Sequence, residues 1–94
     1  MKAEFIPSGD NGTQIEPRTG KKFRLTELQK YVKGSIEKIQ LDKVTFVVND
    51  NRQGLFLNVE ATRVFNMTLY EFNERNKKKY LPIELFGDVV ILYS

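Results

Sequence analysis

The side chains that carry most enzyme chemistry near neutral pH are absent from this sequence. Its 94 residues include no histidine and no cysteine, which excludes imidazole general bases, thiolate nucleophiles and the commonest metal ligands. Four aspartates, Asp10, Asp42, Asp50 and Asp88, remain as candidates, but each lies in a predicted turn, where aspartate commonly bonds to the local backbone. We therefore predict a protein that is not an enzyme and that uses no metal or other cofactor.

Glu37 is the carboxylate whose predicted position is most informative. A straight strand through residues 35–41 places Glu37 on the same face as Ile39 and Leu41. A carboxylate that points toward a core costs several kcal/mol unless it is paired or hydrogen-bonded. We therefore expect Glu37 to have a partner, and we keep a ligand-binding role for it. The alternatives are a structural hydrogen bond, or a bulge or sheet edge that lets Glu37 reach solvent.

Basic residues are concentrated in one part of the chain. The net charge of the whole sequence is +3, yet the segment from Arg18 to Lys38 contains seven lysines and arginines against two glutamates. Phe23 and Tyr31 lie among these cations, and such a mixture can attract phosphate and stack on bases. Solvation of a helix or hairpin surface explains the same charges equally well. The residues that would bind nucleic acid or a nucleotide phosphate are Lys21, Lys22, Arg24, Lys30 and Lys33.

The elements that must position these residues are predicted to form a single α+β domain over residues 1–94. Apolar residues make up 40% of the chain, enough to offset the conformational entropy lost on folding, and all seven phenylalanines are expected in the core. Segments that are rich in β-branched residues, or in which apolar and polar residues alternate, predict strands at 2–6, 13–16, 35–41, 43–49 and 89–93. The last of these lacks alternation, which favours a central strand covered on both faces.

Capping patterns predict the helices. Thr26 opens a capping box before an apolar stripe, which predicts a helix over residues 26–33. Asn58 predicts the start of a second helix, and Thr68 opens another capping box that predicts a third. We therefore expect a small antiparallel or mixed sheet with two or three short helices packed on one face.

The sequence predicts a cytoplasmic protein without a membrane partner. Its longest apolar run, residues 89–93, is far shorter than the roughly 20 residues that cross a bilayer. The N-terminal residues lack the pattern of a signal peptide, and the absence of cysteine suits a reducing compartment.

Three segments of the chain carry a family resemblance. They are Leu28-Gln29-Lys30-Tyr31-Val32-Lys33-Gly34-Ser35-Ile36-Glu37, Asn58-Val59-Glu60-Ala61-Thr62 and Gly87-Asp88-Val89-Val90. Together they resemble an uncharacterised family of small phage and mobile-element proteins. That family has a Val-Gly-Gly-aromatic-Ile-Glu run in the first segment, from which this chain departs at Lys33 and Ser35. The resemblance implies a small accessory protein carried by phages or integrated elements, and it transfers no activity to any residue.

These observations favour a non-enzymatic interaction protein whose partner is another protein, bound through a surface or an exposed sheet edge. A homodimer is included among the expected assemblies. The alternative is a nucleic-acid or nucleotide-phosphate binder that uses the basic segment. An enzyme built from carboxylates, lysines or tyrosines would need two such groups in one cleft.

Overall fold

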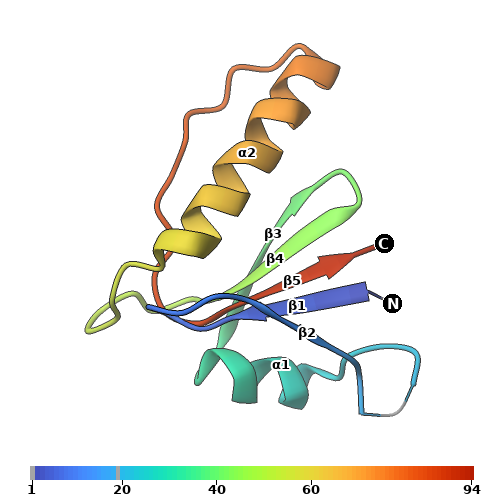
Figure 1. The fold of residues 1–94 in the computed structure, drawn as a ribbon, viewed down its shortest axis with the longest axis vertical. Coiled ribbons are helices and arrows are strands. Elements are labelled where there is room, and N and C mark those ends of the chain that lie inside the picture. Colours follow the sequence, from blue (N-terminus) through green and yellow to red (C-terminus); the bar gives the residue numbers. More distant parts are fainter. Residues whose placement is uncertain (1, 19) are drawn as a thin grey trace.

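In the computed structural model, which describes residues 2–18 and 20–94, five strands form one antiparallel sheet with a helix on each face (Figure 1). The strand order across the sheet is β2-β1-β5-β4-β3. Along the chain the elements are β1 (Lys2–Ile6), β2 (Thr13–Ile15), α1 (Leu25–Val32), β3 (Ile36–Leu41), β4 (Val44–Asn49), α2 (Val59–Asn76) and β5 (Val89–Tyr93). The predicted α+β class is confirmed.

β5 is the central strand of the sheet, as its sequence predicted. Val89, Val90 and Ile91 are all fully buried, because successive side chains alternate between two covered faces. The strand pairs with β1 on one side and with β4 on the other, so the two ends of the chain lie close together (Figure 1). A strand in this position needs apolar residues without alternation, and β5 has them.

The two helices lie on opposite faces of the sheet, whereas the sequence prediction placed the helices on one face. Phe46 of β4 points toward α2 and packs edge-on against Phe65, with ring centroids 4.9 Å apart. The next residue, Val47, points the other way and packs with Leu28 and Val32 of α1. Because β4 and β5 are apolar on both faces, a single layer of helices would leave much of that surface in water.

α2 is one continuous helix of 18 residues, where we predicted two shorter helices. The predicted boundary depended on Thr68 as a cap, but Thr68 Oγ1 donates to the carbonyl oxygen of Val64 at 2.9 Å. This bond satisfies the hydroxyl within the helix, so the helix continues. The start of α2 agrees with the prediction, because Asn58 Oδ1 accepts the N–H of Ala61 at 3.0 Å.

α1 begins at Leu25, one residue before the predicted start. Its first turn is closed by Glu27 and not by the predicted capping residue Thr26. Glu27 Oε1 accepts the N–H of Arg24, the residue that precedes the helix, at 3.1 Å. A carboxylate at this position satisfies a free backbone donor and also interacts favourably with the positive end of the helix dipole.

Candidate functional site

Glu37 reaches solvent, so the prediction of a core-facing carboxylate that needs a partner is wrong. It lies on the same face of β3 as Ile39 and Leu41, and Leu41 is buried in the core beneath α2. β3 is the outermost strand of the sheet, however, and the Glu37 side chain is exposed. The structure agrees with the sheet-edge alternative, in which a charged side chain discourages edge-to-edge pairing with another sheet.

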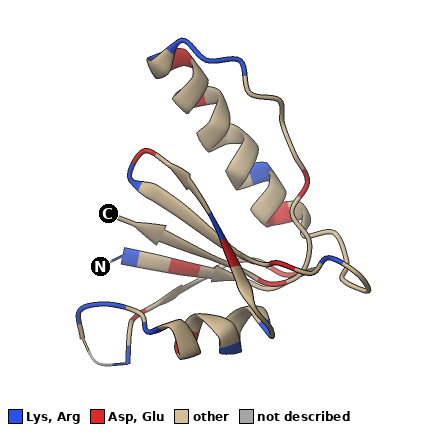
Figure 2. Cartoon of the chain, turned by 180° about the vertical axis from the view of Figure 1, so that it is seen from behind, with Lys and Arg blue, Asp and Glu red and all other residues tan. Residues whose placement is uncertain are grey.

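The predicted basic residues are all exposed, and they are divided between the two ends of α1. Lys21 and Lys22 lie in the loop between β2 and α1, and Arg24 directly precedes the helix. Lys33 lies at the opposite end of α1, where its Nζ is 3.2 Å from the carboxylate of Asp88. Figure 2 shows the basic loop and α1 along one edge of the molecule, far from the lysines that follow α2.

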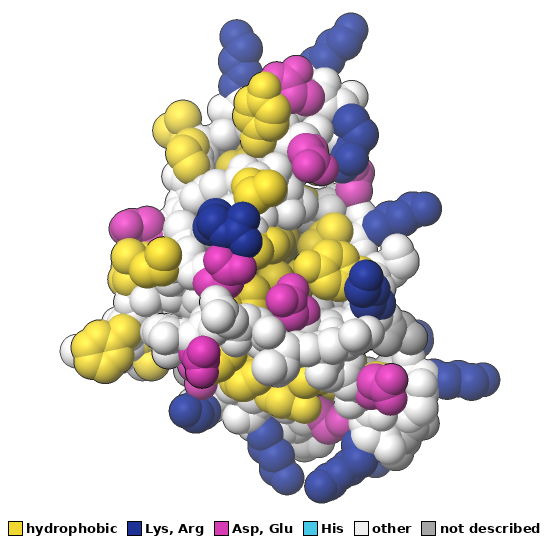
Figure 3. Space-filling model, in the orientation of Figure 1, with side chains coloured by type: hydrophobic (Ala, Val, Ile, Leu, Met, Phe, Trp, Pro, Cys, Tyr) yellow, Lys and Arg dark blue, Asp and Glu magenta, His cyan; other side chains and the backbone are white. Residues whose placement is uncertain are grey.

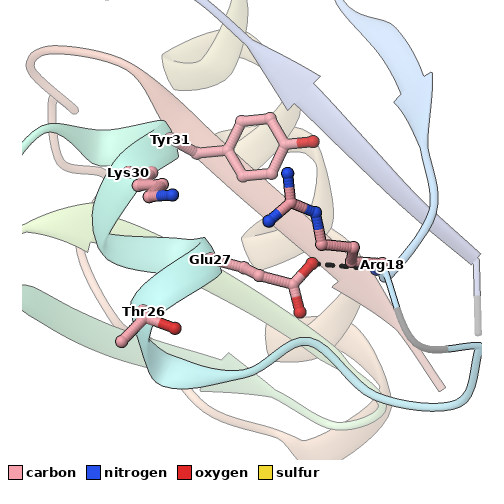
Figure 4. Close-up of a pocket in the computed structure, with 5 residues that line it drawn as sticks. All are labelled: Arg18, Thr26, Glu27, Lys30 and Tyr31. Atoms are coloured by element: carbon pink, nitrogen blue, oxygen red, sulfur yellow. Dashed lines mark hydrogen bonds between the residues drawn. The ribbon is translucent and has the colours of Figure 1, made fainter.

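Two cations from this segment, Arg18 and Lys30, meet at an open pocket of about 320 Å³. Thr26, Glu27 and Tyr31 of α1 also line it. Figure 4 shows the Arg18 guanidinium beside the Tyr31 ring, with the Glu27 carboxylate next to them. The pocket therefore combines an aromatic ring and two cations with one carboxylate, and its lining has a net charge of only one positive unit.

Both oxygens of the Glu27 carboxylate in this pocket accept hydrogen bonds from backbone N–H groups. Glu27 Oε2 accepts the N–H of Arg18 at 2.9 Å, in addition to the bond from Arg24. These two backbone hydrogen bonds lower the pKa of the Glu27 carboxyl below its ordinary value. Glu27 thus fastens the basic loop to α1, and its charge opposes the binding of an anion in the same pocket.

Of the three segments that carry the family resemblance, the third contacts each of the other two at one end of the sheet. Asn58 Nδ2 donates to the carbonyl oxygen of Gly87 at 2.8 Å and to that of Ile6 at 2.9 Å. Lys33 of the first segment pairs with Asp88 of the third. Asn58 is fully buried and its side chain is satisfied by protein groups, so these residues form a structural junction.

After α2 the chain turns back, and residues 80–87, which we call the strap, run along the helix (Figure 1). Asn73 Nδ2 donates to the carbonyl oxygen of Tyr80 at 3.0 Å, and Asn73 Oδ1 accepts the N–H of Tyr80 at 3.3 Å. Asn66 makes the same pair of bonds with Ile83, at 3.0 and 3.2 Å. The two asparagines therefore give the strap the backbone partners that a neighbouring strand would otherwise supply.

Sequence reasoning missed this arrangement. Thr62 completes it, because its Oγ1 accepts the N–H of Leu85 at 2.9 Å and donates to the carbonyl oxygen of the same residue at 3.3 Å. Thr62, Asn66 and Asn73 lie along one edge of α2 at helical spacing. Three amide or hydroxyl side chains on one edge of a helix were the available signal for an extended segment docked beside it.

Most of the large exposed apolar side chains lie in α2, in the strap or just before α2. Of nine such residues in the described chain, eight lie between positions 56 and 83, and the other is Leu25. The exposed fraction is 67% for Tyr70, 54% for Met67 and 81% for Leu81. Figure 3 shows apolar side chains over α2 and along the margin that the strap follows. Phe56, expected in the core like the other phenylalanines, is 82% exposed in the loop before α2, so that prediction is wrong.

Four residues of α2 form what we call the outer stripe: Arg63, Met67, Tyr70 and Glu74. Their spacing places them on one side of the helix. Glu60, one turn earlier, orders the start of the stripe, because its carboxylate accepts from Arg63 Nε at 2.8 Å and from Arg63 Nη2 at 2.7 Å. These hydrogen bonds lower the pKa of the Glu60 carboxyl and raise the pKa of the Arg63 guanidinium, so both groups stay charged near neutral pH.

Comparison of the chain with protein-family models, curated proteins and solved structures gave no match. Among the described residues, neither helix has the length and apolar character needed to span a membrane. The relationship to phage and mobile-element proteins stays a prediction from the sequence.

Proposed function

We propose that this protein is a non-enzymatic interaction protein that binds another protein through the outer stripe of α2 and the apolar side chains beside it. The supporting observation is the concentration of exposed large apolar residues between positions 56 and 83. Apolar surface of this kind is unfavourable in water, and where it is contiguous it is typical of interaction sites. Tyrosine and arginine, both present in the stripe, are the residue types most enriched at the energetic centres of interfaces.

The proposed surface is ordered before a partner arrives. Asn66 and Asn73 fasten the strap at Ile83 and Tyr80, and Leu81 lies between these two fixed points. Because these hydrogen bonds already hold the strap beside the helix, little further conformational entropy is lost on binding. We therefore expect a preformed surface that docks without rearrangement. A segment that folds only on its partner is disfavoured.

The biological setting that we propose follows from the family resemblance. The segments at 28–37, 58–62 and 87–90 support an accessory role in a phage or an integrated mobile element, acting in the cytoplasm. The hydrogen bonds of Asn58 and the ion pair of Asp88 account for several of these residues as scaffold. The resemblance therefore supports the setting, and the outer stripe supports the mode of action.

The second candidate is the binding of nucleic acid or a nucleotide phosphate. It is supported by the meeting of Arg18, Lys30 and Tyr31 at one pocket, a combination that suits a phosphate beside a stacked base. Glu27 in the same pocket and the ion pair of Lys33 with Asp88 weigh against it.

Site-specific photocrosslinking in extract of the natural host tests the proposal. Tyr70 is replaced by p-benzoylphenylalanine, and the matched control carries the same group at Lys22 in the basic loop. Extracts are irradiated with and without nuclease. The proposal expects a protein adduct from position 70 that survives nuclease treatment and does not form from position 22. Nuclease-sensitive adducts from position 22, with none from position 70, would contradict it in favour of the second candidate.

A further inference from the structure

We infer that the partner that fits the outer stripe is a second copy of this chain, packed along α2 in an antiparallel two-fold dimer. This inference rests on the proposed function, because it names an occupant for the surface proposed there. The inference is supported by the order of residues in the stripe, because this order makes the stripe complementary to a second, antiparallel copy of itself.

Complementary residues occupy mirror positions about the point midway between Met67 and Tyr70. Arg63 lies four positions before Met67, and Glu74 lies four positions after Tyr70. In an antiparallel two-fold pair, mirror positions face each other. Met67 then packs on the partner's Tyr70, a favourable contact between sulfur and an aromatic ring. Arg63 faces the partner's Glu74, and symmetry makes each of these contacts occur twice.

The charges of the stripe also determine the direction of the pairing. A parallel pairing would instead place Arg63 against the partner's Arg63 and Glu74 against the partner's Glu74, and both contacts are repulsive. The charges thus select the antiparallel arrangement.

The residues of the stripe are exposed in the described structure, and Arg63 keeps hydrogen-bonding capacity for these contacts. The Arg63 side chain is 56% exposed, and Met67 and Tyr70 are more than half exposed. The Arg63 guanidinium uses three N–H groups within the chain. Nε and Nη2 each donate one to the Glu60 carboxylate, and Nη1 donates one to the Met67 sulfur. A guanidinium has five N–H groups, so one on each terminal nitrogen is left for the partner's Glu74.

Sedimentation equilibrium of the full chain tests the inference. A helix of 18 residues is about 27 Å long, so the contact belongs to the small end of interface sizes, and we expect a Kd on the order of 10–100 µM. The fitted mass should rise from one chain toward two chains between about 10 µM and about 1 mM. Arg63→Glu or Glu74→Arg alone should raise the Kd at least about tenfold, because each creates two like-charge contacts.

The combined variant Arg63→Glu with Glu74→Arg should bind more tightly than either single variant, since it re-creates both interchain pairs with reversed charge. It does not regain the full wild-type affinity, because the Glu60–Arg63 ion pair is lost. Lys38→Glu, an exposed charge reversal on β3, is the matched control and should leave the Kd unchanged. Circular dichroism verifies that each variant is folded. A wild-type mass of one chain over the whole range, or a combined variant that binds no better than the single variants, would overturn the inference.

These outcomes are distinguishable from a failure of the proposed function. A monomeric chain that still gives a protein adduct at position 70 retains the proposed function and overturns only the assignment of a second copy. A monomeric chain without any adduct at position 70 overturns both.

Discussion

The Asn66 side chain and the backbone of Ile83 bind each other twice, with Nδ2 donating to the carbonyl oxygen at 3.0 Å and Oδ1 accepting the N–H at 3.2 Å. The contact satisfies both backbone groups of a residue that has no strand beside it at this point. Because the strap carries Leu81 and Ile83 on the exposed surface, Asn66 helps to connect the fold to the proposed interface, together with Asn73 and Thr62.

Replacing Asn66 with alanine should release the middle of the strap without unfolding the domain. Two hydrogen bonds are lost at a largely exposed site, for a local cost of about 1 kcal/mol. Hydrogen exchange should show about fivefold lower protection of the Ile83 amide, with the amides of β5 unaffected. Asn76→Ala is the control, because Asn76 bonds only within α2, to the carbonyl oxygen of Phe72. Equal exchange at Ile83 in both variants would mean that Asn66 does not hold the strap.

Asn58 should be among the most sensitive positions for stability. Its buried side chain donates to two carbonyl oxygens and caps α2. Asn58→Ala leaves these groups unpaired in the core, and we expect a loss of about 3 kcal/mol in the free energy of unfolding, measured with urea. Asn58→Asp keeps the cap acceptor but not the donors, so it should also destabilise. A loss below about 1 kcal/mol in the alanine variant would show that water replaces the amide there.

Glu27 should contribute stability that depends on pH. The bonds from Arg18 and Arg24 lower the pKa of its carboxyl in the folded state, so folding favours the charged form. The stability difference between the wild type and Glu27→Gln should be constant above the carboxyl pKa of the unfolded chain. It should shrink as pH falls from there through the lower pKa of the folded state. Thermal melting from neutral to acidic pH measures it, and a difference that grows in acid would have the opposite sign to this linkage.

Gly34 and Asn49 should behave as a coupled pair. Asn49 Nδ2 donates to the carbonyl oxygen of Val32 at the end of α1, at 3.1 Å, and a Cβ atom at position 34 would lie 2.6 Å from that nitrogen. Gly34→Ala should therefore displace the amide and cost about 1–2 kcal/mol. In an Asn49→Ala background the same change should cost much less. Urea unfolding of the four proteins gives the coupling, and additive effects would show that the two residues act independently.

The parts of the fold that local sequence could predict are those whose signal is complete within a few residues. Asn58 was identified as a cap because capping needs only a short polar side chain and the next turn of backbone. The central position of β5 followed from its unbroken apolar run. At Thr68 the same reasoning failed, because a threonine hydroxyl can either cap a helix or bond to a carbonyl one turn earlier within it. Which of these two roles applies depends on the length of apolar surface that α2 covers.

The features that could not be predicted depend on how distant segments meet. Glu37 was expected to face the core because alternation along its strand places it on the same side as Ile39 and Leu41. The order of strands, however, makes β3 an edge strand, so the Glu37 side chain reaches solvent. The spacing of Arg63, Met67, Tyr70 and Glu74 is present in the sequence, yet their exposure follows only once the sheet and the strap are placed around α2. The mirror relationship within the stripe became interpretable after that exposure was known.

An isotope-filtered NOE experiment on a mixed sample detects the antiparallel pairing of two α2 helices itself. One half of the protein carries ¹³C-labelled methionine methyl groups and the other half is unlabelled, and the chain has only two methionines, so the Met67 signal is readily assigned. At about 1 mM, we expect NOEs between the labelled Met67 methyl group and the Tyr70 ring protons of unlabelled chains. Intermolecular NOEs from that methyl group to residues outside the outer stripe, or none at all, would contradict it.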